Sequence, residues 1–179
     1  AKLLDNFASG YNVLKEQMTK LREEDWERSC FHRRGPLPIS AYVALSVEEL
    51  AVHSWDIRWG LDPATKLWPE PLTLLVGRVP RWLTNAFQTG MDLPTPVHYR
   101  FDVAGPVPVQ NDLVVTGNSF ESKPSSDGKA DVIFTCDTGN YILLIYGRLD
   151  VNQAIVQERL RVQGSREQAV NFTAWFKGF

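Results

Sequence analysis

A carboxylate and an imidazole lie four residues apart in this sequence, at Glu49 and His53. Because an α-helix places residues i and i+4 one above the other, both side chains can reach the same ion. Carboxylate oxygen and imidazole nitrogen are ligands of zinc and of similar divalent metals. The spacing is compatible with part of a metal site, but by itself it is more typical of a local hydrogen-bonded pair on a half-buried helix.

Asp56 and Trp55 extend this chemistry along the same helix. Asp56 follows His53 by three residues, so its carboxylate lies about one turn further along. We predict that Asp56 orients the imidazole through a hydrogen bond or acts as a catalytic base beside the metal. Trp55 lies near enough to this face to line a substrate pocket. Zinc or a similar divalent ion would also need a third protein ligand and an open position.

The helix that carries these residues is predicted over about Ser40 to Trp59, with Ser40 as its cap. Its remaining apolar residues form a stripe that we expect to face the core: Val43, Val47, Leu50 and Ile57. Upstream, apolar residues at spacings of three and four predict a long amphipathic helix from Leu4 to about Arg28. Because the first residue is Ala1 rather than methionine, we expect further sequence before it.

A third helix is predicted from Pro71 to Gln88, with Pro80 kinking or splitting it. Glycine and proline residues between 89 and 96 then mark a boundary, so we expect one domain over 1–92 and another over 93–179. Alternation of period two from Val97 to Val103 predicts a half-buried strand. Further strands are expected near 113–116, 131–135 and 160–162, with helices over about 138–146 and 165–176. The predicted fold class is therefore α+β.

Composition limits the kinds of partner. The 179 residues are 44% hydrophobic and 22% charged, and a formal net charge of −2 offers no basic field for nucleic acid or an anionic membrane. No apolar run approaches the roughly 20 residues that span a bilayer. Cys30 and Cys136 match no paired pattern, which favours a reducing cytoplasm. We expect a cytoplasmic monomer or small homo-oligomer that acts on a small molecule.

The string 48–57, Glu-Glu-Leu-Ala-Val-His-Ser-Trp-Asp-Ile, followed by Gly60, resembles the E-x-x-x-H-x-W-D helix of the mycothiol-dependent maleylpyruvate isomerase family. That family lies within the broader DinB-like helical bundles, and the Gly-Pro-Leu-Pro loop at 35–38 is also similar. In the family this glutamate and this histidine are two of three zinc ligands, so the resemblance assigns Glu49 and His53 as metal ligands. The third family ligand is a histidine on a helix upstream of Ala1. The resemblance thus implies a DinB-like bundle that lacks its first helices here.

The second half of the chain resembles the small sterol carrier-like α+β domain that these enzymes carry. The resemblance rests on the segments 130–134, 146–150 and 160–164. Because the family uses an arginine of this domain for its substrate, Arg148 and Arg161 are the candidates to pair with a substrate carboxylate.

The function that the resemblance implies is a metal-dependent enzyme that uses a low-molecular-weight thiol. Zinc would hold mycothiol or a related thiol as a thiolate, for isomerisation or S-transfer on a small electrophilic substrate. An alternative is a metal-free relative of the scaffold that binds a small molecule or catalyses a non-thiol biosynthetic step such as a cyclisation. A third is a lipid-binding module built on the sterol carrier-like domain.

Overall fold

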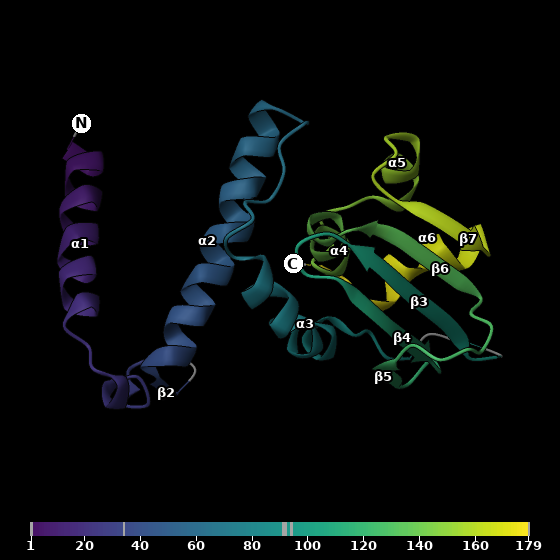
Figure 1. Cartoon of the computed structure of the whole chain (residues 1–179), viewed down its shortest axis with the longest axis horizontal. Helices are drawn as coiled ribbons and strands as arrows, with labels where there is room; N and C mark the ends of the chain where they lie inside the picture. The colour runs from purple at the N-terminus through teal and green to yellow at the C-terminus, as the bar shows by residue number, and fades with distance from the viewer. Residues whose placement is uncertain (1, 34, 91–92, 94, 179) are drawn as a thin grey trace. The chain divides into compact units, whose positions relative to one another are not determined.

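The computed structural model describes residues 2–33, 35–90, 93 and 95–178 of the chain. Its helices and strands follow one another in the order drawn in Figure 1. Contacts group the chain into two compact units, Ala1–Leu50 and Ala51–Phe179, so the division falls inside a helix. The predicted domain boundary between 92 and 93 adjoins residues outside the described part, and it stays a prediction. The α+β fold class is confirmed.

The first unit begins with helix α1 (Lys2–Thr19), which is shorter than predicted. It ends before Arg28 because a short 3-10 helix, η1 (Glu23–Asp25), follows it. The Asp25 carboxylate accepts hydrogen bonds from the Arg22 backbone N–H at 3.0 Å and from Arg28 Nη1 at 3.1 Å. These bonds hold the chain in a turn in place of a further helical turn. Strands β1 (Ser29–Cys30) and β2 (Leu37–Pro38) then pair antiparallel.

Helix α2 (Ile39–Leu61) follows directly and carries the candidate metal ligands, as predicted. Ser40 lies inside the helix and its hydroxyl donates to Glu27 Oε1 at 3.0 Å, so its prediction as the cap is wrong. The prediction of a core stripe is also wrong for Leu50 and Ile57, which are 67% and 70% exposed. The packed face of this helix is instead marked by Ala51, Val52 and Trp55. Apolar periodicity identifies both faces and cannot decide which of them is covered.

The second unit contains a five-stranded sheet with the order β5-β4-β3-β6-β7. Its strands are β3 (Val97–Ala104), β4 (Val109–Val115), β5 (Phe120–Pro124), β6 (Val132–Asp137) and β7 (Arg161–Gly164). The central strand β3 runs antiparallel to β4 and parallel to β6, with Phe101 opposite Phe134. Alternate residues of β3 are buried, as its period of two predicts.

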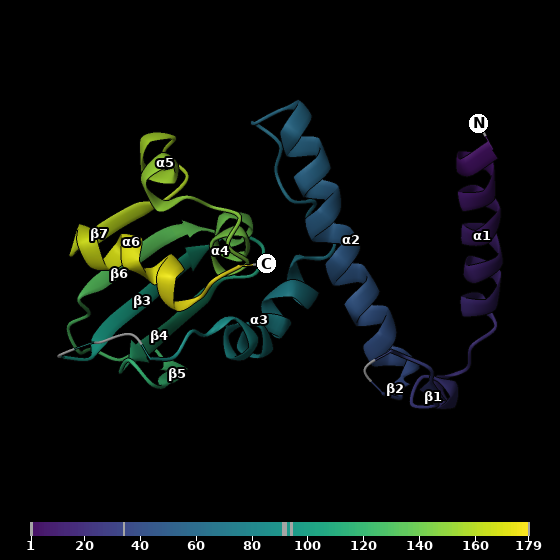
Figure 2. The same ribbon diagram turned by 180° about the vertical axis from the view of Figure 1, so that it is seen from behind.

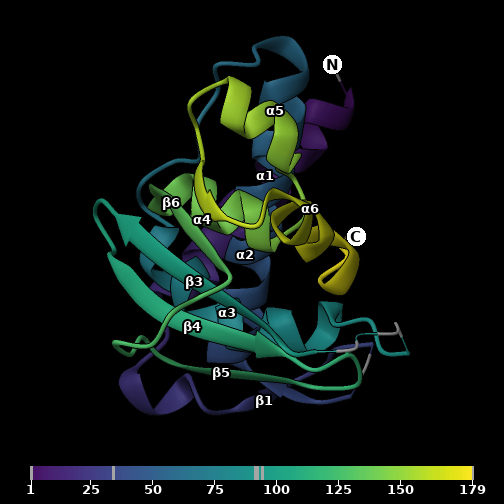
Figure 3. The same ribbon diagram turned by 90° about the vertical axis from the view of Figure 1, so that its right-hand side faces the viewer.

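Two helices cover one face of this sheet, as Figures 2 and 3 show. They are α4 (Thr138–Ile145), capped by Asp137, and α6 (Arg166–Trp175), capped by Ser165. The ring of Phe101 lies 5.3 Å from that of Tyr141 on α4 and 5.5 Å from that of Phe172 on α6. Both helices therefore pack on the same aromatic face. A short helix that was not predicted, α5 (Val151–Val156), lies between α4 and β7 in the chain.

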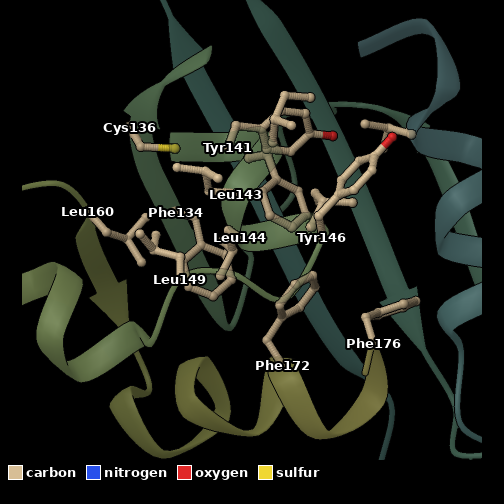
Figure 4. Packing of buried hydrophobic residues seen from close by; sticks show 14 of the residues in the cluster. Phe134, Cys136, Tyr141, Leu143, Leu144, Tyr146, Leu149, Leu160, Phe172 and Phe176 are labelled. Carbon is tan, nitrogen blue, oxygen red and sulfur yellow. The ribbon is translucent and has the colours of Figure 1, made fainter. Parts of the chain in front are cut away.

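The core between helices and sheet is mainly aromatic and aliphatic. Figure 4 shows side chains from β6, α4 and α6 pointing toward one another. The largest fully buried side chains include Tyr99, Phe101, Phe134, Tyr141, Tyr146, Phe172 and Phe176. Their close packing makes this core the main source of hydrophobic stabilisation in the unit.

Helix α3 (Leu72–Ala86) packs on the same unit. It runs through Pro80 as one helix, so the predicted split does not occur. Its Trp82 ring stacks on Tyr146 at 4.1 Å between centroids. The residue after the helix, Phe87, forms an antiparallel bridge with Phe176, which follows α6. Contacts with Tyr146 and Phe176 thus attach this helix to the sheet domain. No described helix is long and apolar enough to cross a membrane.

A buried charge cluster lies on the sheet around Asp112, which is fully buried on β4. Arg100 on β3 donates to both of its carboxylate oxygens, at 2.8 and 2.9 Å. Ser125 Oγ donates at 3.0 Å, and His98 Nε2 lies 3.0 Å from Oδ2. The Arg100 hydrogen bonds hold the pKa of Asp112 well below its usual range. This network fixes the β3–β4 register and the turn that follows β5.

We predict that Asp112→Asn lowers the free energy of unfolding by about 3 kcal/mol, because it leaves the Arg100 charge without its carboxylate. The carboxylate contribution is complete above its unfolded pKa of about 4 and is lost as the pH falls further. Chemical denaturation between pH 3 and 7 measures both effects. Asp102→Asn, an exposed change on β3, is the control and should cost less than about 0.5 kcal/mol. Equal losses in the two variants, or an unchanged acid dependence in Asp112→Asn, would contradict this account.

Candidate functional site

His53 and Asp56 lie together on α2, as the spacing predicts. The distance from His53 Nδ1 to Asp56 Oδ2 is 3.0 Å. The imidazole is 59% exposed and the carboxylate 33%. A carboxylate at Nδ1 makes this nitrogen the donor, which leaves Nε2 as the atom that would coordinate a ligand. The orienting role predicted for Asp56 therefore has a geometric basis.

Asp56 also contacts Arg148, which is 92 residues further along the chain. Arg148 Nε lies 3.3 Å from Asp56 Oδ1, and Nη2 lies 3.4 Å from Oδ2. The Arg148 side chain is only 14% exposed, and its Nη1 donates to the Tyr146 carbonyl at 3.0 Å. The carboxylate of Asp56 thus bridges an imidazole and a guanidinium. A substrate carboxylate would have to compete with Asp56 for Arg148.

The end of α4 explains why Arg148 is held in place. Gly147 has a φ of 69°, and a methyl group on it would lie 2.6 Å from the Gly178 Cα. A glycine is therefore required where the helix ends. The next N–H, that of Arg148, donates to the Leu143 carbonyl at 2.8 Å. This closure fixes the backbone from which the arginine side chain extends.

Glu49 lies on α2 four residues before His53, with its side chain exposed. The division between the two compact units passes between these residues. Within 2–33, 35–90, 93 and 95–178, no three His, Cys, Asp or Glu side chains form a cluster that could hold a metal ion. Whether Glu49 and His53 bind one ion stays a prediction.

Trp55 and Arg161 do not join the Asp56 contacts. Trp55 is 2% exposed, and its indole N–H donates to the Thr65 carbonyl at 3.1 Å. It therefore packs in the core and stacks on Trp59. Arg161 lies on the edge strand β7, with its side chain exposed. Their roles in substrate binding stay predictions.

The pairing of Asp56 with Arg148 could not be found by sequence reasoning, although each residue was singled out. Contacts between residues of one helix can be predicted from their spacing in the sequence. A contact between residues 92 positions apart has no such periodic signal. The buried network of Arg100 and Asp112 was missed for the same reason. Its only signal is a pair of opposite charges at paired positions of β3 and β4, on the face of the sheet opposite Tyr99 and Leu113.

Comparison with known proteins assigns the second half of the chain. Residues 97–177 match the SCP-2 sterol transfer family. This match begins at β3 and ends just after α6, so the C-terminal half carries an SCP-2 sterol carrier domain. The helices before β3 lie outside it. No curated protein matches the chain.

Similar solved structures include sterol carrier protein 2-like 2 from Aedes aegypti, with 14% identity, a TM-score of 0.42 and coverage of 59% of this chain and 95% of that one. Another is a UbiJ-SCP2 ubiquinone synthesis protein, with 17% identity, a TM-score of 0.39 and coverage of 77% and 96%. A sec-alkylsulfatase, Pisa1 from Pseudomonas sp., has 18% identity and a TM-score of 0.41. The matched region covers 47% of this chain but only 13% of the sulfatase, and 15% of a second sulfatase structure.

We predict that neutral His53 carries its proton mainly on Nδ1, because this nitrogen donates to Asp56. Asp56→Ala removes the acceptor and should shift the proton to Nε2. Nitrogen-15 NMR of labelled protein at pH 8 distinguishes the two tautomers. Asp62→Asn, an exposed change just after α2, is the control and should leave the tautomer unchanged. A wild-type histidine protonated mainly on Nε2 would show that Asp56 does not orient it.

Proposed function

We propose that this chain binds a small hydrophobic molecule through its SCP-2 domain. The observation that supports this most strongly is the family match over 97–177, which takes in all five strands of the sheet and the helices α4 to α6. The family is described as one of sterol transfer. The proposed binding activity agrees with the alternative of a metal-free relative of the scaffold that binds a small molecule.

The proposed binding region is the packed interface at which α4 and α6 meet the sheet. The sheet contributes Phe101 and Phe134, and α6 contributes Phe172, whose ring lies 5.5 Å from each of them. Aromatic rings offer large apolar contact area with few rotatable bonds, as ligand pockets commonly do. A hydrophobic ligand would bind by displacing or rearranging these contacts between helix and sheet.

The charge state of this interior suits an apolar ligand, or the hydrocarbon chain of a ligand whose polar end stays outside. Burial raises the pKa of Cys136 to about 12 and raises the pKa of Tyr99 and Tyr141 well above their usual range. All three groups are therefore neutral at physiological pH. The Tyr99 hydroxyl donates to the Gln168 carbonyl at 3.0 Å, so its polar end is already satisfied. Such a neutral interior favours hydrocarbon over an ionised group.

We predict that the purified chain binds a fluorescent stearate analogue saturably and that palmitate displaces it. Phe172→Leu removes a ring from the proposed region and should change the affinity at least about threefold, because it alters the packed volume. Val156→Ala, on an 80% exposed residue of α5, is the control and should leave the affinity unchanged. Circular dichroism and thermal unfolding verify that both variants are folded.

The proposal is rejected if no saturable binding occurs, or if Phe172→Leu and Val156→Ala bind with the wild-type affinity. Addition of EDTA should not release the probe. This result separates hydrophobic binding from any activity that depends on a metal.

A second candidate function is the thiol-dependent metalloenzyme, favoured by the 3.0 Å contact between His53 Nδ1 and Asp56. Histidines that bind metals commonly donate their other ring N–H to a carboxylate. In this proposal Glu49 and His53 bind zinc or a similar ion, and a third ligand completes the site. The metal would stabilise mycothiol or a related thiol as a thiolate, for isomerisation or S-transfer. Asp56 would position His53, and Arg148 or Arg161 would pair with a substrate carboxylate.

For this second candidate we predict at least half an equivalent of bound zinc in protein purified without chelators. Glu49→Gln and His53→Ala should each lose most of it, because each removes a ligand. Elemental analysis by mass spectrometry measures the content. Glu70→Gln, an exposed change, is the control and should keep the wild-type content. Less than half an equivalent in the wild type, or equal content in all four proteins, argues against the metalloenzyme.

A further inference from the structure

The guanidinium of Arg58 has two nitrogens that donate no hydrogen bond to any described group. Arg58 lies in the last turn of α2, and its Nη1 donates to the Lys66 carbonyl at 3.1 Å. Its other two nitrogens, Nε and Nη2, are buried and have no hydrogen-bond partner. Within the described residues, no Asp or Glu oxygen forms an ion pair with it. Nε and Nη2 therefore form one edge of the guanidinium that has no hydrogen-bond acceptor in the part of the chain that the structure describes.

The surrounding turn holds this guanidinium in a defined orientation. The ring of Trp68 lies against its flat face, with the Arg58 Cζ 4.4 Å from the ring centroid. The Arg58 backbone carbonyl accepts from the Asp62 N–H at 2.8 Å and from Thr65 Oγ1 at 3.4 Å. Trp55 donates to the Thr65 carbonyl and so ties the same turn to the core. The arginine is thus preorganised by contacts that leave its side edge unused.

The chemistry of that edge determines what can satisfy it. A guanidinium stays charged at all physiological pH values and has only donors. The Trp68 ring stabilises the charge through its face but accepts nothing from Nε–H and Nη2–H. Leaving two buried donors of a cation without acceptors is unfavourable. Nε and Nη2 together form the fork that binds two oxygens of one carboxylate or phosphate.

We propose that Arg58 binds an oxyanion, a carboxylate or a phosphate, through Nε and Nη2, with Trp68 against the guanidinium face. Because Nε and Nη2 are covered, the proposal requires that part of the largely exposed segment after α2 moves aside to admit the anion. The site differs in chemistry from the neutral interior of the SCP-2 domain. It lies outside the family match and does not depend on the function proposed above.

The test is a titration of the nitrogen-15 labelled full chain with sodium acetate and, separately, with inorganic phosphate. Sodium chloride keeps the ionic strength constant and serves as the blank. The Nε–H signal of Arg58, assigned by triple-resonance experiments, should shift saturably with a dissociation constant on the order of 1–10 mM. Tighter binding of acetate identifies a carboxylate site, and tighter binding of phosphate a phosphate site.

Arg58→Lys keeps the charge but removes the fork, so the variant should bind the anion at least about tenfold more weakly. Because it lacks the arginine Nε–H signal, its binding is followed through the tryptophan indole N–H signals. Arg81→Lys, an exposed change on α3, is the matched control and should bind as the wild type does. If Arg58→Lys does not fold, the titration of the wild type alone decides the proposal. The proposal is overturned if the Arg58 Nε–H signal does not shift with either anion, or shifts equally with chloride.

Discussion

The packing of two helices on one aromatic face of the sheet is the constraint on which the second unit depends. Phe101 on β3 contacts rings from both helices, Tyr141 on α4 and Phe172 on α6. Further contacts hold the chain where each of these helices ends. Gly147 ends α4 beside Gly178, and Phe87 pairs with Phe176 after α6. The core therefore also fixes the backbone that carries Arg148.

Two parts of the molecule differ in what they can bind. The core of the SCP-2 domain holds its phenols and its thiol in their neutral forms. The surface of α2 carries a carboxylate, Asp56, that bridges an imidazole and a guanidinium. An apolar molecule fits the first environment, and a polar or metal-bound group fits the second. The two proposed functions thus concern different parts of the molecule.

Much of the fold follows from local patterns. The alternation in 97–103 predicted β3, and Asp137 and Ser165 cap their helices as short polar residues do. The spacing of His53 and Asp56 likewise predicted a contact within one helix. Local patterns failed where they had to decide which of two apolar faces of a helix is packed. Leu50 and Ile57 belong to an apolar stripe, but another face of α2 is packed. The pairing of Asp56 with Arg148 depends on the whole tertiary structure and leaves no trace in either local sequence.

Location of a bound hydrocarbon is the most direct test of the central claim, that the SCP-2 domain binds a hydrophobic molecule between its helices and its sheet. Intermolecular nuclear Overhauser effects can be measured between carbon-13 labelled palmitate and the unlabelled chain. The account predicts cross-peaks from the acyl chain to the ring protons of Phe101 and Phe172. Cross-peaks confined to exposed residues such as Val156, or none at all, would contradict it.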